Sequence, residues 1–121
     1  RISPTKSTLN RKMPFTVHND APVVPPDMIR LLWSTTNRKT RSGKVLGEEQ
    51  KISTYDALKA ITINAAYQHF EDDIKGTIEV GKQADLVVLS MDPLKIDTEN
   101  LLEIDVMATF SRGIEIFNAK K

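Results

Sequence analysis

The sequence contains no cysteine among its 121 residues. Disulfide bonds and thiolate metal sites are therefore excluded, and the composition fits a reducing compartment, so we expect a cytoplasmic location. Long apolar runs are missing as well, because no stretch approaches the roughly 20 residues that a membrane span needs. We accordingly expect no membrane partner.

Neither sign of charge is in excess, since 17 lysines and arginines face 16 aspartates and glutamates, for a formal net charge of +1. The polar segment 37–51 begins with a local excess of basic residues, namely Arg38, Lys39, Arg41 and Lys44. These side chains could contact phosphates or an acidic substrate. Because no aromatic residues alternate with them, we expect no nucleic-acid partner and predict a mobile surface loop that could border a site.

The first 14 residues have neither helical nor strand periodicity, and the chain begins with Arg1 rather than Met. Pro4 and Pro14 restrict the residues before them to extended conformations, so we predict a connector over residues 1–14. The length suits one modest domain. We expect the chain to be a piece of a longer protein.

Two stretches have helical patterns. Asp27 can cap a short helix over residues 28–36, where apolar residues recur at helical spacing. Ser53 and Asp56 form an S-x-x-D start signal for a longer helix over residues 54–69. The many alanines on and beside its apolar stripe permit close approach to a sheet or to another helix.

From residue 75 onwards the pattern changes to that of strands. A run of four apolar residues predicts a strand covered on both faces, and a two-residue turn predicts a hairpin. Three or four strands are too few to close a sandwich or barrel, so this part requires strands from elsewhere. The predicted elements are a strand through Ile78 and Val80, a turn at Gly81, strand 86–89, a helical turn over 99–103, strand 104–110, a turn at Arg112–Gly113 and strand 114–117.

The segment FTVHNDAPVVPP, residues 15–26, combines a strand pattern with polar side chains near its end. Side chains two apart on a strand share a face, so Thr16, His18 and Asp20 would point one way and the apolar residues the other. An imidazole and a carboxylate aimed together could transfer protons or hold a metal. The alternative is a capped loop in which Asp20 bonds nearby backbone N–H groups; the isolated H-x-D pattern is a weak motif and favours this alternative.

Three stretches, in this order and at these spacings, resemble one known family. GTIEVGKQADLVVLS, residues 76–90, resembles the C-terminal signature of the amidohydrolase superfamily, and YDALKAITINAAYQHF, residues 55–70, resembles the helix just before it. FTVHNDAPVVPP resembles the end of that family's eighth barrel strand. The branch that looks most similar groups N-substituted formamide deformylase with proteins named exoenzyme regulatory protein.

The resemblance implies an α/β fold, namely the C-terminal fragment of a TIM-barrel amidohydrolase plus strands of a composite β-sandwich. Residues 1–70 would form the end of the (β/α)8 barrel, including strand eight, and residues 71–121 the C-terminal part of the sandwich. Gly76, Gly81 and Asp85 of the signature look like structural turn residues in that family. Local physics agrees, because glycine can take a positive φ and an aspartate can bond a turn backbone.

The resemblance also implies metal-dependent hydrolysis of a non-peptide carbon–nitrogen bond in a small-molecule amide, formamide or cyclic amide. Asp20 matches the family's aspartate that contacts the metal, expected to be zinc, or its water, and would be the catalytic residue. His18 resembles a residue found beside that aspartate in this branch of the family. Its role would at most be to position other groups of the site.

The family's other metal ligands have no match in this chain. We therefore expect the isolated fragment to bind no metal tightly, to be inactive and, with exposed sheet edges, to self-associate. One alternative is a non-catalytic regulatory or binding module that retains the amidohydrolase fold. Another is an independent α+β binding domain, which leaves the small number of strands unexplained.

Overall fold

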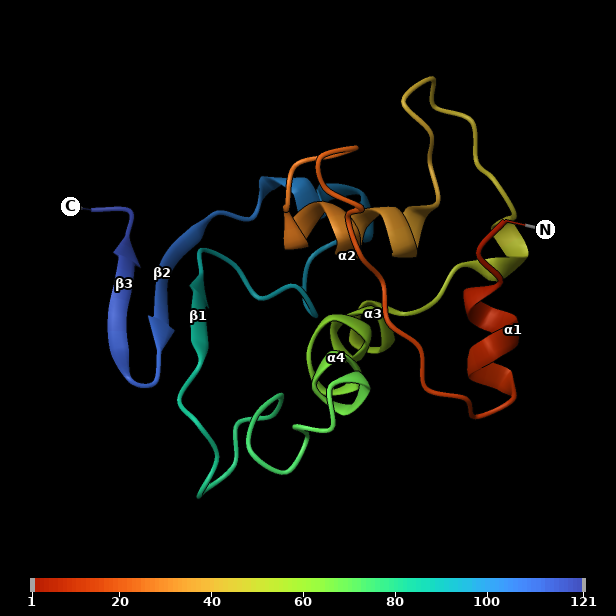
Figure 1. The fold of residues 1–121 in the computed structure, drawn as a ribbon. Coiled ribbons are helices and arrows are strands. Elements are labelled where there is room, and N and C mark those ends of the chain that lie inside the picture. Colours follow the sequence, from red (N-terminus) through yellow and green to blue (C-terminus); the bar gives the residue numbers. More distant parts are fainter. Residues whose placement is uncertain (1, 121) are drawn as a thin grey trace.

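The computed structural model describes residues 2–120 and consists of a helical part and a small sheet beside it (Figure 1). The sheet lies on the side of the molecule away from the first helix. None of the described helices is long and apolar enough to cross a membrane. In chain order the elements are α1 (Thr5–Asn10), α2 (Met28–Asn37), the 3-10 turn η1 (Glu48–Gln50), α3 (Thr54–Ile61), α4 (Ile63–Gln68), β1 (Leu86–Leu89), the 3-10 turn η2 (Thr98–Glu103), β2 (Val106–Ser111) and β3 (Ile114–Asn118).

The hydrophobic core lies where α2, α3 and η2 meet. Leu32 of α2 and Leu101 of η2 are almost completely buried, with 1% and 0% of their surfaces exposed. Burial of a leucine side chain stabilises a fold by roughly 1.5–3 kcal/mol. Ala57 and Ala60 of α3 are fully buried, so the predicted close approach through alanines is confirmed.

The predicted starts of α2 and α3 are confirmed. The Arg30 N–H donates to Oδ1 of Asp27 at 3.0 Å, and the Asp56 N–H donates to Oγ of Ser53 at 3.1 Å. Each cap satisfies a backbone donor that has no partner within its helix. The ammonium group of Lys59 beside Asp56, followed by the Ser53 hydroxyl, lowers the pKa of the Asp56 carboxyl, so this carboxyl stays charged at the positive end of the α3 dipole.

The predicted helix over residues 54–69 is interrupted at Thr62, where φ is −122° and ψ is −94°. The Thr62 hydroxyl donates to the Leu58 carbonyl at 2.7 Å. Threonine side chains can compete in this way with the backbone hydrogen bonds of a helix. The single helix of the prediction is therefore two helices, α3 and α4.

The prediction of a connector over residues 1–14 is wrong because α1 lies within it. Its partners are distant in sequence: the Thr5 hydroxyl donates to the Gln50 carbonyl at 2.6 Å, and the Ser7 N–H donates to the Gln50 side chain at 3.0 Å. Contacts some 45 residues away leave no local pattern, and tertiary contacts stabilise most short helices.

The sheet is antiparallel in the order β1-β2-β3. The predicted hairpin is confirmed, since Arg112 and Gly113 join Ser111 to its partner Ile114. Two other predictions are wrong. Val87 and Val88 of β1 are 53% and 48% exposed rather than covered on both faces, and Ile78 and Val80 belong to no strand. Within residues 2–120 the two valines are thus only about half covered, and Ile78 and Val80 are 89% and 108% exposed.

Candidate functional site

The segment Phe15–Asp20 forms no strand, contrary to the prediction. A strand requires a hydrogen-bonded neighbour, and residues 2–120 contain none for this segment. Helix α4 holds it instead: the side-chain amide of Asn64 donates to the Phe15 carbonyl at 2.9 Å, and the Thr16 hydroxyl donates to Gln68 at 2.8 Å. Phe15 packs against the core, as its predicted apolar face requires.

Asp20 lies in a tight turn. Its φ is +55°, in the left-handed region that aspartate tolerates better than most residues. The Val23 N–H donates to the Asp20 carbonyl at 2.8 Å, across the cis bond between Ala21 and Pro22. The alternation expected for a strand therefore stops at Asp20.

The same turn brings Asp20 and His18 together. The backbone N–H of Asp20 donates to Nδ1 of His18 at 3.1 Å, and both residues are exposed. No donor among residues 2–120 reaches the Asp20 carboxylate, and a backbone hydrogen bond closes the loop instead. The carboxylate is thus available to a ligand, on the same turn as an imidazole.

Asn19 is a residue that the sequence interpretation missed. It is 8% exposed, and its Oδ1 has no hydrogen-bond partner among the described residues. A polar residue at an apolar-face position of the predicted strand was the available signal. An unpaired buried acceptor costs about 1–3 kcal/mol, so this oxygen, next to Asp20, is a place where a further donor would stabilise the turn.

His18 and Asp20 do not make a metal site by themselves. Within residues 2–120, no group of three or more His, Cys, Asp or Glu side chains could hold a metal ion. A catalytic zinc has about three protein ligands. The imidazole and the carboxylate are suitable donor types, but a complete site would need ligands from outside this chain.

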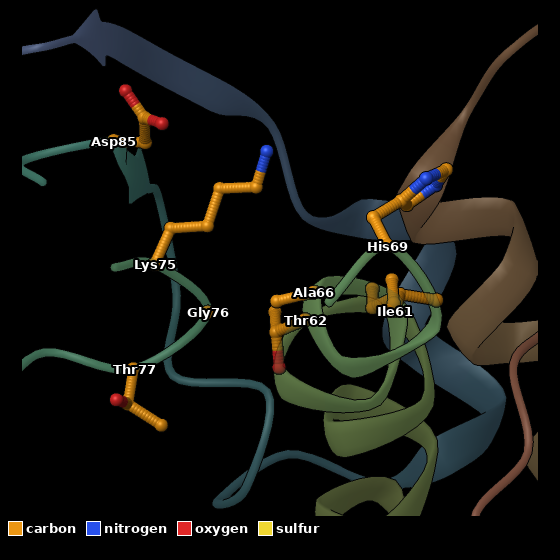
Figure 2. Close-up of a pocket in the computed structure, with 9 residues that line it drawn as sticks. Ile61, Thr62, Ala66, His69, Lys75, Gly76, Thr77 and Asp85 are labelled. Carbon is orange, nitrogen blue, oxygen red and sulfur yellow. The ribbon is translucent and has the colours of Figure 1, made fainter. Parts of the chain in front are cut away.

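A hollow of about 340 Å³ lies between the helices α3 and α4 and the start of residues 76–90, here called the signature segment. Figure 2 shows Lys75, Gly76, Thr77 and Asp85 on one side of it and residues of the helices, among them Ala66, on the other. Its charged groups are already engaged: the Lys75 ammonium lies 2.5 Å from Glu71, and the Asp85 carboxylate accepts hydrogen bonds from Arg112 and Gln83. This hollow therefore offers little free charge to a ligand.

The signature segment is held together by its own polar residues. Lys82 donates to the Asp72 carbonyl and to the Thr77 hydroxyl, each at 2.7 Å. Gly76 and Gly81 have φ values of +99° and +93°. The Arg112 N–H donates to Oδ1 of Asp85 at 2.9 Å, so the segment is joined to the turn between β2 and β3.

We expect this Asp85 contact to be sensitive to acid. The hydrogen bond from the Arg112 N–H, with a further one from Gln83, lowers the pKa of Asp85 below its usual 3.8. Because the folded-state pKa is the lower one, the contact stabilises the fold above about pH 4 and is lost as the pH falls through the folded-state pKa. Asp85→Asn should therefore make the melting temperature fall less steeply on acidification than in the wild type. Parallel slopes for the two proteins in thermal unfolding would contradict this expectation.

Residues 1–117 match the amidohydrolase family. The chain is 29% identical over 114 residues to the N-substituted formamide deformylase of Arthrobacter pascens, covering 94% of this chain and 21% of that protein. It is 31% identical over 98 residues to the Bacillus subtilis protein YtcJ, named as an amidohydrolase, covering 78% and 18%. It is also 40% identical over 65 residues to the imidazolonepropionase of Picrophilus torridus, covering 54% and 16%.

The fold agrees with these similarities. The crystal structure of an amidohydrolase from Thermotoga maritima superposes with a TM-score of 0.64 at 28% identity, covering 91% of this chain and 24% of that one. The resemblance drawn from the three motifs is therefore confirmed. The chain spans about a fifth of the length of the curated relatives it matches.

Proposed function

The chain belongs to the amidohydrolase family, and from this premise we propose that it is the C-terminal region of a metal-dependent hydrolase acting on a non-peptide carbon–nitrogen bond. The substrate class is a small amide, formamide or cyclic amide. Two relatives support this choice by name, a formamide deformylase and an imidazolonepropionase. The observation that carries the proposal is the Asp20 carboxylate, which is exposed and accepts no hydrogen bond among residues 2–120. The backbone of the same residue bonds to His18.

In the proposed reaction Asp20 moves one proton. It accepts a proton from the attacking water as the water oxygen bonds to the carbonyl carbon and the carbonyl electron pair shifts to oxygen. It then delivers that proton to the amide nitrogen as the carbon–nitrogen bond breaks and the carbonyl re-forms. The products are a carboxylic acid, or formic acid from a formamide, and an amine. A divalent metal bound in the whole protein, which we propose to be zinc, would lower the pKa of its water to about 7 and polarise the substrate carbonyl.

The proposed architecture of the whole protein explains what this chain leaves uncovered. We assign residues 1–70 to the end of a (β/α)8 barrel and residues 71–121 to a β-sandwich completed by other strands of the same protein. Support comes from Phe15–Asp20, which has no strand partner among residues 2–120, and from the half-exposed valines of β1. The chain in isolation would self-associate through this apolar sheet.

Metal removal tests the proposal directly. The full-length protein should hydrolyse at least one substrate from a panel of an N-substituted formamide, an N-acyl amine and a cyclic amide. Chelation should abolish this turnover because the water would lose its activation, and added Zn²⁺ should restore it. Amine release and metal content would be measured on the same samples. A folded, metal-loaded protein without turnover on the whole panel would favour the non-catalytic regulatory module instead.

The isolated chain of residues 1–121 serves as the control for that experiment. We expect it to show no amide hydrolysis and no stoichiometric zinc in chelator-free preparations, since His18 and Asp20 fall short of the required ligand number. One equivalent of zinc bound with submicromolar affinity would show that the site is complete within this chain, contrary to the proposal.

A further inference from the structure

The hydrogen bond between Asp20 and His18 identifies which ring nitrogen of His18 carries the proton. The donor is the backbone N–H of Asp20, and the acceptor is Nδ1 of His18 at 3.1 Å. A ring nitrogen can accept only through its lone pair. In this geometry Nδ1 is the unprotonated nitrogen, and the ring N–H is on Nε2.

This tautomer decides what His18 can do at the site. A histidine binds a metal through the lone pair of a ring nitrogen. In His18 the lone pair of Nδ1 is used by the Asp20 N–H, and Nε2 is occupied by its own proton. The imidazole therefore presents a donor and no free acceptor, which suits hydrogen bonding to an oxygen and not coordination of a metal.

The surroundings leave that donor free. His18 is exposed, and no acceptor among residues 2–120 receives its Nε2–H. The turn that orients the ring also contains Asp20, and it is closed independently by the hydrogen bond from Val23 to the Asp20 carbonyl at 2.8 Å. The structure thus places a hydrogen-bond donor and a carboxylate on one turn.

We propose that His18 donates its Nε2–H to the carbonyl oxygen of the substrate and is not a metal ligand. This assignment rests on the proposed amide hydrolysis. The oxygen gains negative charge when water adds to the carbonyl carbon, and a donor held in place beforehand stabilises that charge. His18 is then a catalytic residue in its own right, beside the proton acceptor Asp20.

The tautomer is measurable without any assay of activity. In the full-length protein labelled with ¹⁵N-histidine, two-bond proton–nitrogen correlations distinguish Nδ1 from Nε2 and show which one is protonated. The His18 signals are identified by their loss in His18→Gln. We expect the Nε2–H form in both the metal-free and the Zn²⁺-loaded protein. A change to the Nδ1–H form on loading with Zn²⁺, or a change of the Nδ1 chemical shift to that of a metal-bound nitrogen, would make His18 a ligand and overturn the proposal.

Two substitutions then separate donation from mere packing. A glutamine amide reaches to about the position of Nε2 and can donate there, whereas an asparagine side chain ends near the position of Nδ1. His18→Asn should lower kcat/KM about tenfold, the usual worth of one hydrogen bond, and His18→Gln should restore most of the loss. The same changes at exposed His69, whose ring has no comparable backbone hydrogen bond within residues 2–120, should leave kcat/KM unchanged.

The outcomes distinguish this proposal from the one on which it rests. Equal losses in folded, metal-loaded His18→Asn and His18→Gln would reject donation by Nε2 even if the enzyme is an amide hydrolase. Absence of hydrolysis in the wild type, with the Nε2–H form intact, would reject the proposed reaction and with it the catalytic part of the His18 assignment. Loss of turnover in His18→Asn, rescued in His18→Gln with metal content unchanged, would support both.

Discussion

Asp20→Asn should lower the kcat of the full-length protein by about 10²–10⁴-fold, the usual cost of removing a general base. Asparagine has the same size and cannot accept the proton from the attacking water. The substitution should leave the turn intact, because asparagine also tolerates the φ of +55° found at this position. The hydrogen bond to Nδ1 of His18 comes from the backbone of residue 20 and does not depend on its side chain.

A matched substitution at Asp27 controls for the loss of a charge. Asp27 caps α2 by accepting the Arg30 N–H at 3.0 Å, and asparagine caps helices equally well. Asp27→Asn should therefore retain wild-type kcat. Metal content and circular dichroism would accompany both variants. Near-wild-type turnover in folded, metal-loaded Asp20→Asn would remove the catalytic role of Asp20 and favour a non-catalytic module.

The features that local sequence predicts correctly are those determined by neighbouring residues. Asp27 and Ser53 each bond an N–H three residues ahead, and Arg112–Gly113 connects adjacent strands. Each helix cap and the hairpin turn join residues only a few positions apart. The residues that form them can therefore be recognised in a short stretch of sequence. The helix starts and the hairpin were accordingly predicted at the right places.

The features that local sequence does not predict depend on distant or additional partners. Helix α1 is held by Gln50, more than 40 residues away. The segment Phe15–Asp20 has a strand pattern but no paired neighbour among residues 2–120, and Val87 and Val88 of the apolar strand β1 stay about half exposed. Alternating apolar and polar side chains predict which face of a segment is apolar. They do not show whether a neighbouring strand is present to pair with the segment through hydrogen bonds.

The candidate site was predictable in its residues and not in its geometry. The H-x-D spacing identified His18 and Asp20 as neighbours. The positive φ of Asp20 and the hydrogen bond to Nδ1 of His18 replace the shared strand face that the spacing predicted. A turn that depends on one residue in the left-handed region leaves no repeating pattern in the sequence. Aspartate itself gives no signal either, because it occupies both the extended and the left-handed regions.

Gly76→Ala should be the most destabilising single substitution in the signature segment. A Cβ at Gly76 would lie 2.9 Å from the Ile63 Cα and 2.9 Å from the Ala66 Cβ, both in α4. Backbone and methyl groups at that distance cannot move aside as a flexible side chain could. The φ of +99° adds the strain of a left-handed conformation, about 1–2 kcal/mol, and the overlap adds roughly 1–3 kcal/mol.

Gly81→Ala separates these two costs, because Gly81 has nearly the same φ of +93°. Apart from its two chain neighbours, no residue among 2–120 has an atom within 4 Å of the position that an alanine Cβ would take. It should therefore incur only the conformational cost, and its melting temperature should fall by less than that of Gly76→Ala. Thermal unfolding of the two full-length variants beside the wild type measures the difference. If the two melting temperatures fell equally, close packing of the signature segment against α4 at Gly76 would be rejected.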